Sequence, residues 1–364
     1  MSYDIYLPSY SIGEDVYERV KEVCAGNKSR AVVIGGHRAM AAVRDKLLKA
    51  ICGSGIEITA WEYYGGEASY ENVDRLSALE TVKNADYIWG VGGGKATDTA
   101  KAVADVLKKN IYTFPTIASN CSACTSVSIM YREDNTFLRP YFFAKPPAHA
   151  FIDTQIIAAA PHKYMWAGMG DTYAKYFEST VSSRDEEVSH YVAQGVASSY
   201  MCYEPIMRYG YKGYTDHQNG VNSYEFEQVV LSIIVSTAVA SILLTTDKVI
   251  DYNTGLGHAI FYALTAYPHI EKYHLHGEVV AYGILILLLV DGDEENFRRV
   301  YDFNKSVGLP VCLSDIGMSE SELPKLVSAT LAMKDIEHNP YKITEDMLMN
   351  AFLKLEEIND KGEK

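Results

Sequence analysis

Short apolar runs alternate with longer amphipathic stretches up to about residue 155 of the chain. Apolar runs at 30–36 and 87–94 each lead into a glycine turn, and residues 111–118 form a third run of this kind. Such runs predict buried strands, whereas 40–51 and 70–84 have the apolar spacing of helices. The alternation of strand and helix predicts a parallel sheet that is covered by helices on both faces.

Beyond about residue 161 the pattern changes to long helical runs, such as 185–204, 223–244 and 279–289. A chain of 364 residues is long enough for two domains at about 150 residues each. We therefore predict a dinucleotide-binding α/β domain over residues 1–160 and an all-α domain over residues 161–364.

Two segments of the helical half need separate interpretation. Residues 229–246 carry no charge and are nearly long enough to cross a bilayer. Their recurring serines and threonines, and the lack of a flanking basic cluster, favour a buried core helix. Residues 210–220, GYKGYTDHQNG, are polar and rich in glycine, which predicts a loop.

Composition excludes several classes of partner. Lys and Arg number 33 against 47 Asp and Glu, a formal net charge of −14, and such a surface repels nucleic-acid phosphates and anionic lipids. We expect a small-molecule substrate, and neither nucleic acid nor membrane. The first residues resemble no secretory signal, and the six cysteines form no paired framework, so we expect a cytoplasmic protein without structural disulfides.

The segment GVGGGKATDTAK, which begins at Gly90, is the most specific local feature of the first half. Three consecutive glycines after a buried strand let a ligand approach the backbone, and the following helix presents free N–H groups to an anion. The spacing matches neither G-x-G-x-x-G nor a P-loop. The residues alone leave a structural glycine turn and a pyrophosphate site equally open.

Three candidate metal ligands lie far apart in the second half: Asp171, His258 and His276. Carboxylate and imidazole donors suit Zn²⁺ or Fe²⁺ if they converge. Asp171 stands just before a helical run and could equally be an N-terminal cap, and each histidine could be an ordinary core or surface residue. Sequence spacing cannot join the three.

Four strings occur in order: GVGGGKATDTAKAVAD, FPTIASNCSACTSVSIMY, AGMGDTYAKYFE and TGLGHAIFYALTAYPHIEKYHLHGEVVAYG. Together they resemble the iron-containing alcohol dehydrogenase superfamily, specifically its glycerol dehydrogenase-like branch. The resemblance implies the fold shared with dehydroquinate synthase-like enzymes, in which the active site lies between an α/β and a helical domain. It also implies NAD(P)-linked oxidation of a CH–OH group and a homo-oligomer.

The same resemblance implies that Asp171, His258 and His276 hold a divalent metal. Members that use iron commonly have a histidine four residues after the aspartate, where this chain has Lys175. This difference favours Zn²⁺ over Fe²⁺. Apart from these three ligands we predict no catalytic side chain, and the sequence identifies no general base.

Cofactor-binding residues also follow from the resemblance. Gly92, Gly93, Gly94 and Lys95 would line the pyrophosphate. The residues predicted to flank the rest of the cofactor are Thr116, Ser119, Thr125, Val127 and Tyr131. We add Asp98, for which a local ion pair with Lys101 is the alternative.

Two departures from the family pattern bear on specificity. Glycerol dehydrogenases carry an aspartate where this chain has Cys121, which is similar to hydroxycarboxylate dehydrogenase-like members that act on 2-oxo acids. NAD-preferring members place an acidic residue after the first sheet strand, where this chain has Gly36 followed by His37 and Arg38. A missing carboxylate beside cationic donors favours NADP(H) over NAD(H).

The leading hypothesis is therefore a metal-dependent NAD(P)-linked dehydrogenase for a small hydroxylated or 2-oxo acid substrate. One alternative is a dehydroquinate synthase-like cyclase, although the segments around Asp171 and His258 lack the basic cluster that a phosphorylated substrate needs. The other alternative is a non-catalytic binding protein with the same fold.

Overall fold

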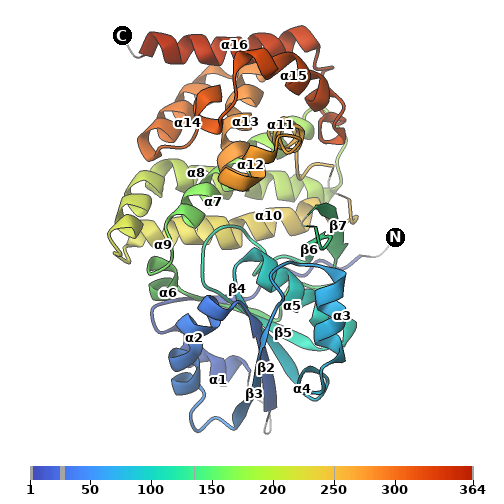
Figure 1. The fold of residues 1–364 in the computed structure, drawn as a ribbon, viewed down its shortest axis with the longest axis vertical. Helices are drawn as coiled ribbons and strands as arrows, with labels where there is room; N and C mark the ends of the chain where they lie inside the picture. Colours follow the sequence, from blue (N-terminus) through green and yellow to red (C-terminus); the bar gives the residue numbers. More distant parts are fainter. Residues whose placement is uncertain (1–2, 25–28, 135, 250, 363–364) are drawn as a thin grey trace. The chain divides into compact units, whose positions relative to one another are not determined.

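The computed structural model describes residues 3–24, 29–134, 136–249 and 251–362. The chain divides into two compact units. Figure 1 shows the chain coloured along the sequence, from blue at the N-terminus to red at the C-terminus. The first comprises Met1–Pro161 with Gly220–Asn222, and the second comprises His162–Asn219 with Ser223–Lys364.

A six-stranded parallel sheet forms the centre of the first unit, with strand order β1-β8-β5-β4-β2-β3. Its strands are β1 (Tyr10–Gly13), β2 (Ser29–Gly35), β3 (Ile56–Tyr63), β4 (Tyr87–Gly92), β5 (Asn110–Pro115) and β8 (His149–Asp153). A separate antiparallel hairpin consists of β6 (Val127–Tyr131) and β7 (Phe137–Phe142).

Helices cover both faces of this sheet, as the alternation along the chain predicts. Ala31 and Val33 of β2 enter one apolar core with residues of α2, and Val32 and Ile34 enter the opposite core with residues of α3 and α5. The helices of this unit are α1 (Val20–Val23), α2 (His37–Ala50), α3 (Tyr70–Ala78), α4 (Glu80–Lys83), α5 (Gly94–Val106) and α6 (Thr154–Ala158).

The strand order changes direction at β2, which pairs with β3 on one side and with β4 on the other. In open α/β sheets, ligands bind at the carboxyl ends of the strands that flank such a switch point. Here those ends are Gly35 of β2 and Gly92 of β4, and α2 and α5 begin just after them. The fold thus predicts a ligand site at the glycine turns found in the sequence.

The described residues of the second unit form helices joined by turns and loops, and none of them lies in a strand. Its helices are α7 (Lys163–Ser182), α8 (His190–Gln218), α9 (Tyr224–Leu231), α10 (Thr237–Leu244), α11 (Leu256–Leu264), α12 (Pro268–Tyr273), α13 (His276–Asp291), α14 (Glu294–Val307), α15 (Leu323–Leu331) and α16 (Glu345–Gly362). Helix α13 is buried from Gly277 to Leu288, since it packs against α7, α11, α14 and α16. The predicted fold class, an α/β domain followed by an all-α domain, is confirmed.

The uncharged segment at 229–246 lies mostly within α9, α10 and the π-helical turn Ser232–Ser236 that joins them. Helical residues Tyr224–Leu244 are long and apolar enough to cross a membrane, but 72% of the most apolar window is buried inside the protein. Ser232 bonds the carbonyl oxygen of Met201 in α8 at 2.9 Å. This burial confirms the prediction of a core helix.

The predicted loop at 210–220 is wrong, because α8 continues to Gln218. Gly210 and Gly213, two of the three glycines of that stretch, lie where helices pack closely. A Cβ at Gly210 would lie 2.7 Å from the ring of Phe303, and one at Gly213 would lie 3.0 Å from the carbonyl oxygen of Glu225. These glycines permit close helix packing, which a local turn signal cannot distinguish from a loop.

Candidate functional site

The three candidate metal ligands meet in the second unit, each on a different helix. Asp171 lies inside α7, His258 in the first turn of α11, and His276 at the start of α13. The Nε2 atoms of His258 and His276 lie 3.5 Å and 3.4 Å from Oδ1 of Asp171. Because Asp171 is within α7, its alternative interpretation as an N-terminal cap is wrong.

A glycine beside each ligand lets the helices approach closely enough for this convergence. A Cβ at Gly170 would overlap the carbonyl oxygen of Gly277, and a Cβ at Gly277 would overlap that of Ala167. A Cβ at Gly257 would lie 2.7 Å from Ile284 of α13. Backbone contact between α7 and α13 therefore sets the distance between Asp171 and His276.

The donor set fits one divalent ion. All three ligand atoms lie within 4.8 Å of one another. Ligand atoms around a tetrahedral ion with bonds of about 2.1 Å are separated by about 3.4 Å, close to both distances between Asp171 and the histidines. One carboxylate and two imidazoles also leave a fourth position open, as catalytic zinc sites require.

Glu178 fixes the orientation of the His258 ring. The backbone N–H and the Nδ1–H of His258 donate to the two carboxylate oxygens of Glu178, at 2.8 Å and 2.6 Å. The Glu178 side chain is fully buried. Since Nδ1 is occupied by this bond, Nε2 faces Asp171 and is available to a metal.

Glu178 is not among the site residues predicted from the sequence. A usable signal exists, because Glu178 follows Asp171 by two helical turns and therefore lies on the same face of α7.

A second carboxylate, Glu278, holds the start of α13 by accepting hydrogen bonds from the backbone N–H of Leu275 at 2.9 Å and from Nδ1 of His274 at 2.7 Å.

Electrostatics at the site favour bound positive charge. Burial opposes protonation of His258, but the carboxylates of Glu178 and Asp171 outweigh it and raise the pKa of His258 to about 10. Burial likewise opposes ionisation of Asp171, yet hydrogen bonds and charge from His258 and His276 hold its pKa well below the usual range. A cation at the ligand atoms would take the place of the proton that these carboxylates stabilise.

We expect Glu178→Gln to weaken divalent metal binding by about 10–100-fold, the range typical for groups that orient a metal ligand. The substitution preserves volume, but the amide NH₂ replaces one carboxylate oxygen and cannot accept, so one of the two bonds from His258 is lost. Metal titration with a competing chelator measures the effect. Glu186→Gln is the matched control, because Glu186 binds the non-ligand His338 at 2.9 Å; equal effects from both variants would contradict the role of Glu178.

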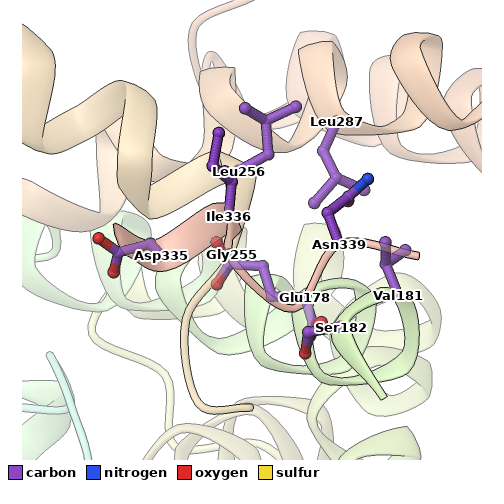
Figure 2. Close-up of a pocket in the computed structure, with 9 residues that line it drawn as sticks. All are labelled: Glu178, Val181, Ser182, Gly255, Leu256, Leu287, Asp335, Ile336 and Asn339. Carbon is purple, nitrogen blue, oxygen red and sulfur yellow. Dashed lines mark hydrogen bonds between the residues drawn. The ribbon is translucent and has the colours of Figure 1, made fainter. Parts of the chain in front are cut away.

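A small cavity adjoins Glu178, lined also by Ser182, Asp335 and Asn339 (Figure 2). Its volume is about 10 Å³, room for no more than one water. This cavity is too small for a substrate. Figure 2 therefore shows part of the packing around Glu178.

In the first unit, the glycine turn lies between β4 and α5, at the carboxyl edge of the sheet. Gly92 has φ +141°, a conformation that side chains disfavour. Cβ atoms at Gly93 and Gly94 would lie 2.5 Å from Ile117 and 2.6 Å from Asn120. The turn thus requires glycine for its own packing, besides any ligand.

Two predicted cofactor residues have protein partners here. Lys95 forms an ion pair with the buried Glu67, and Asp98 forms a buried ion pair with Lys101 at 3.0 Å. Lys101 also donates to the carbonyl oxygen of Val127 at 2.6 Å and lies 3.3 Å from the hydroxyl of Thr125. Asp98, Thr125 and Val127 therefore belong to a network that holds β6 against α5.

Other predicted residues gather at the same edge of the sheet. The backbone N–H of Thr116 donates to the carbonyl oxygen of Gly92 at 3.2 Å. Ser119 and Cys121 follow Thr116 in the segment after β5. Gly36 caps α2, and the ring of His37 stacks on Tyr63 at 4.3 Å. Tyr131, at the end of β6, lies under the ammonium of Lys95. Cofactor contacts by all these residues stay predictions.

Comparison with known proteins identifies the family. The model for iron-containing alcohol dehydrogenase matches residues 8–154. The chain is 34% identical over 304 residues to a glycerol dehydrogenase from Thermotoga maritima, 78% of each chain. It is 31% identical over 333 residues to hydroxycarboxylate dehydrogenase A from Escherichia coli, 90% of each chain. The structure of glycerol dehydrogenase from Schizosaccharomyces pombe has a TM-score of 0.85 at 24% identity, covering 99% of this chain and 92% of the other.

These similarities define an NAD-linked dehydrogenase that acts on alcohols. The chain belongs to the iron-containing alcohol dehydrogenase family, with glycerol dehydrogenase-like and hydroxycarboxylate dehydrogenase-like relatives. The resemblance found in the sequence is thereby confirmed.

Proposed function

We propose that this protein is a metal-dependent NAD(P)-linked oxidoreductase that interconverts a small 2-hydroxy acid and the corresponding 2-oxo acid. The observation that carries the proposal is the convergence of Asp171, His258 and His276 at distances suited to one divalent ion. The relatives reported above are named as dehydrogenases, which favours this proposal over a cyclase or a non-catalytic binding protein.

Each part of the site has a defined role in this proposal. When bound, a divalent ion supplies Lewis-acid polarisation of the substrate oxygen and a nicotinamide accepts or donates the hydride, so that alcohol oxidation releases one proton to solvent. Asp171, His258 and His276 hold the ion, and Glu178 orients His258. We assign the glycine turn Gly92–Gly94 to the pyrophosphate, because the adjoining α5 directs its N-terminus there.

The proposed metal is Zn²⁺. Nitrogen and carboxylate donors suit both zinc and iron, so the ligand types alone do not decide. Lys175 occupies the position of the additional histidine in iron-using members, and its ammonium donates to the side-chain and backbone oxygens of Asn253. A protonated lysine offers no lone pair to a metal, which leaves three protein ligands.

The proposed substrate class rests on Cys121. A thiol there, in place of an aspartate, cannot accept strong hydrogen bonds from the vicinal hydroxyls of glycerol. It also removes a negative charge that would repel an anionic substrate. One relative that matches 90% of this chain is named hydroxycarboxylate dehydrogenase A. We also propose that the protein is cytoplasmic and forms a homo-oligomer. Light scattering, which measures the mass of the particle in solution, tests the oligomer.

NADP(H) is the proposed cofactor, and Gly36→Asp should shift preference toward NAD(H). A Cβ at Gly36 would lie 3.6 Å from its nearest neighbour, Tyr64, so a side chain fits. A carboxylate near the ribose repels a 2′-phosphate, and we expect the kcat/KM ratio to change by about 10–100-fold. Leu48→Asp, an exposed position later in α2, is the control for added charge; an equal effect of Gly36→Asp on both cofactors would place Gly36 away from the ribose.

A nicotinamide absorbance assay tests the function itself. Purified protein is offered diols and 2-oxo acids with each cofactor, before and after treatment with a chelator. We expect turnover that the chelator removes and Zn²⁺ restores. Turnover that survives complete metal removal, or no turnover of the 2-oxo acids, would contradict the proposal.

A further inference from the structure

Three charged side chains share one face of α7: Asp171, Lys175 and Glu178. Their spacing of four and three residues places them in a single row. The first is a candidate metal ligand, and the last orients His258. The ammonium-bearing side chain between them has no role in the function described so far.

Lys175 is only 6% exposed, yet its hydrogen-bond partners are neutral. Its Nζ donates to Oδ1 of Asn253 at 2.8 Å and to the carbonyl oxygen of the same residue. Within the described part of the chain, no carboxylate lies within 4.0 Å of this ammonium. The buried Lys101 is different, because Asp98 lies 3.0 Å from its Nζ.

A buried cation without a close counter-ion is unusual, since buried charges are normally paired. Asp171 and Glu178 are the nearby carboxylates in the row, but both are engaged by histidines. When a divalent ion is bound, its two positive charges and the one on Lys175 face two negative charges, those of Asp171 and Glu178. One positive charge is therefore left in excess. The row is therefore suited to a ligand that brings its own negative charge.

We propose that Lys175 binds the carboxylate of the substrate and selects 2-oxo and 2-hydroxy acids over neutral diols and ketols. This assignment rests on the proposed dehydrogenase function. A lysine carries its charge on a flexible four-carbon chain, so the ammonium can exchange one Asn253 oxygen for a substrate oxygen. Asn253 then serves as the resting partner of the ammonium.

Pyruvate and hydroxyacetone provide a matched pair of probes. The two compounds share a methyl ketone, and pyruvate carries a carboxylate where hydroxyacetone carries a CH₂OH group. In Lys175→Met we expect kcat/KM for pyruvate reduction to fall by about 10–100-fold, the effect of losing one charge-assisted hydrogen bond. The value for hydroxyacetone should change by less than about twofold. Lys212→Met, at a surface lysine of α8 paired with Asp216, is the control and should alter neither.

Asn253→Asp tests the same idea with Lys175 intact. The substitution is nearly isosteric and gives the ammonium a permanent counter-ion, so we expect the same selective loss for pyruvate. Asn253→Ala keeps the cation uncompensated and should retain the preference for pyruvate over hydroxyacetone. Calorimetric binding of oxamate to the metal-loaded proteins gives a readout other than turnover, and metal analysis checks that each variant keeps its ion.

Equal losses for both probes would show that Lys175 only secures the segment before α11, and unchanged values would show that it does not reach the substrate. Either result overturns the assignment, while metal-dependent reduction of pyruvate by the wild-type protein leaves the proposed function standing. If the wild-type protein turns over neither probe and holds no metal, the proposed function itself fails.

Discussion

Replacing His276 with alanine is expected to abolish turnover. The imidazole supplies one of three ligands, and Lewis-acid stabilisation contributes several kcal/mol to such reactions. A loss of about 10³-fold or more in kcat follows from about 4 kcal/mol. The bound metal should fall in parallel, and nicotinamide affinity should be largely retained, because the glycine turn belongs to the other unit of the chain.

Steady-state kinetics, metal analysis and cofactor titration of the same preparation measure these three quantities. His190→Ala is the matched control, since His190 is an exposed histidine at the start of α8 in the same unit. If His276→Ala retained native activity with native metal content, the assignment of this residue as a ligand would be wrong.

Gly277→Ala should have the second largest effect. Its Cβ would overlap the carbonyl oxygen of Ala167 and lie 3.0 Å from Cβ of Asp171. Relief of this overlap requires α13 to move away from α7, which separates His276 from Asp171. We expect a loss of stability of about 1–3 kcal/mol from overpacking. We also expect metal affinity to fall by about 10–100-fold, as when groups that orient a ligand are disturbed.

Thermal unfolding and metal titration of the Gly277→Ala protein separate the two effects. Gly292→Ala provides the control, because Gly292 has φ +73° at the end of α13 with open space around its Cβ position. That variant should lose about 1 kcal/mol through backbone strain and keep its metal affinity. A Gly277→Ala protein that binds metal normally would show that helix separation does not control the site.

Much of the sheet-forming half could be predicted from sequence, because strand runs and glycine turns are local signals. The runs predicted at 30–36 and 87–94 correspond to β2 (Ser29–Gly35) and β4 (Tyr87–Gly92). The turn after β4 could be located but not interpreted. Its glycines serve packing against Ile117 and Asn120, which depends on a segment that folds back after β5.

The metal site could not be built from local pattern. Asp171, His258 and His276 converge through contacts among α7, α11 and α13, and only a resemblance spanning the chain could join them. Asp171 illustrates the difficulty, because the helical run after it suggested a helix start, whereas α7 begins at Lys163 and runs through Asp171. Glu178 was missed because its partner is remote in sequence, although the helical period places it in the row with Asp171.

Titration of metal-free protein with Zn²⁺ tests the central claim most directly, with bound metal and the rate of nicotinamide absorbance change measured in each sample. The proposed site predicts that the rate rises in proportion to bound metal and stops rising at one ion per chain, and that His276→Ala stays inactive throughout. A full rate without metal, or a His276→Ala protein that follows the wild-type curve, would contradict it.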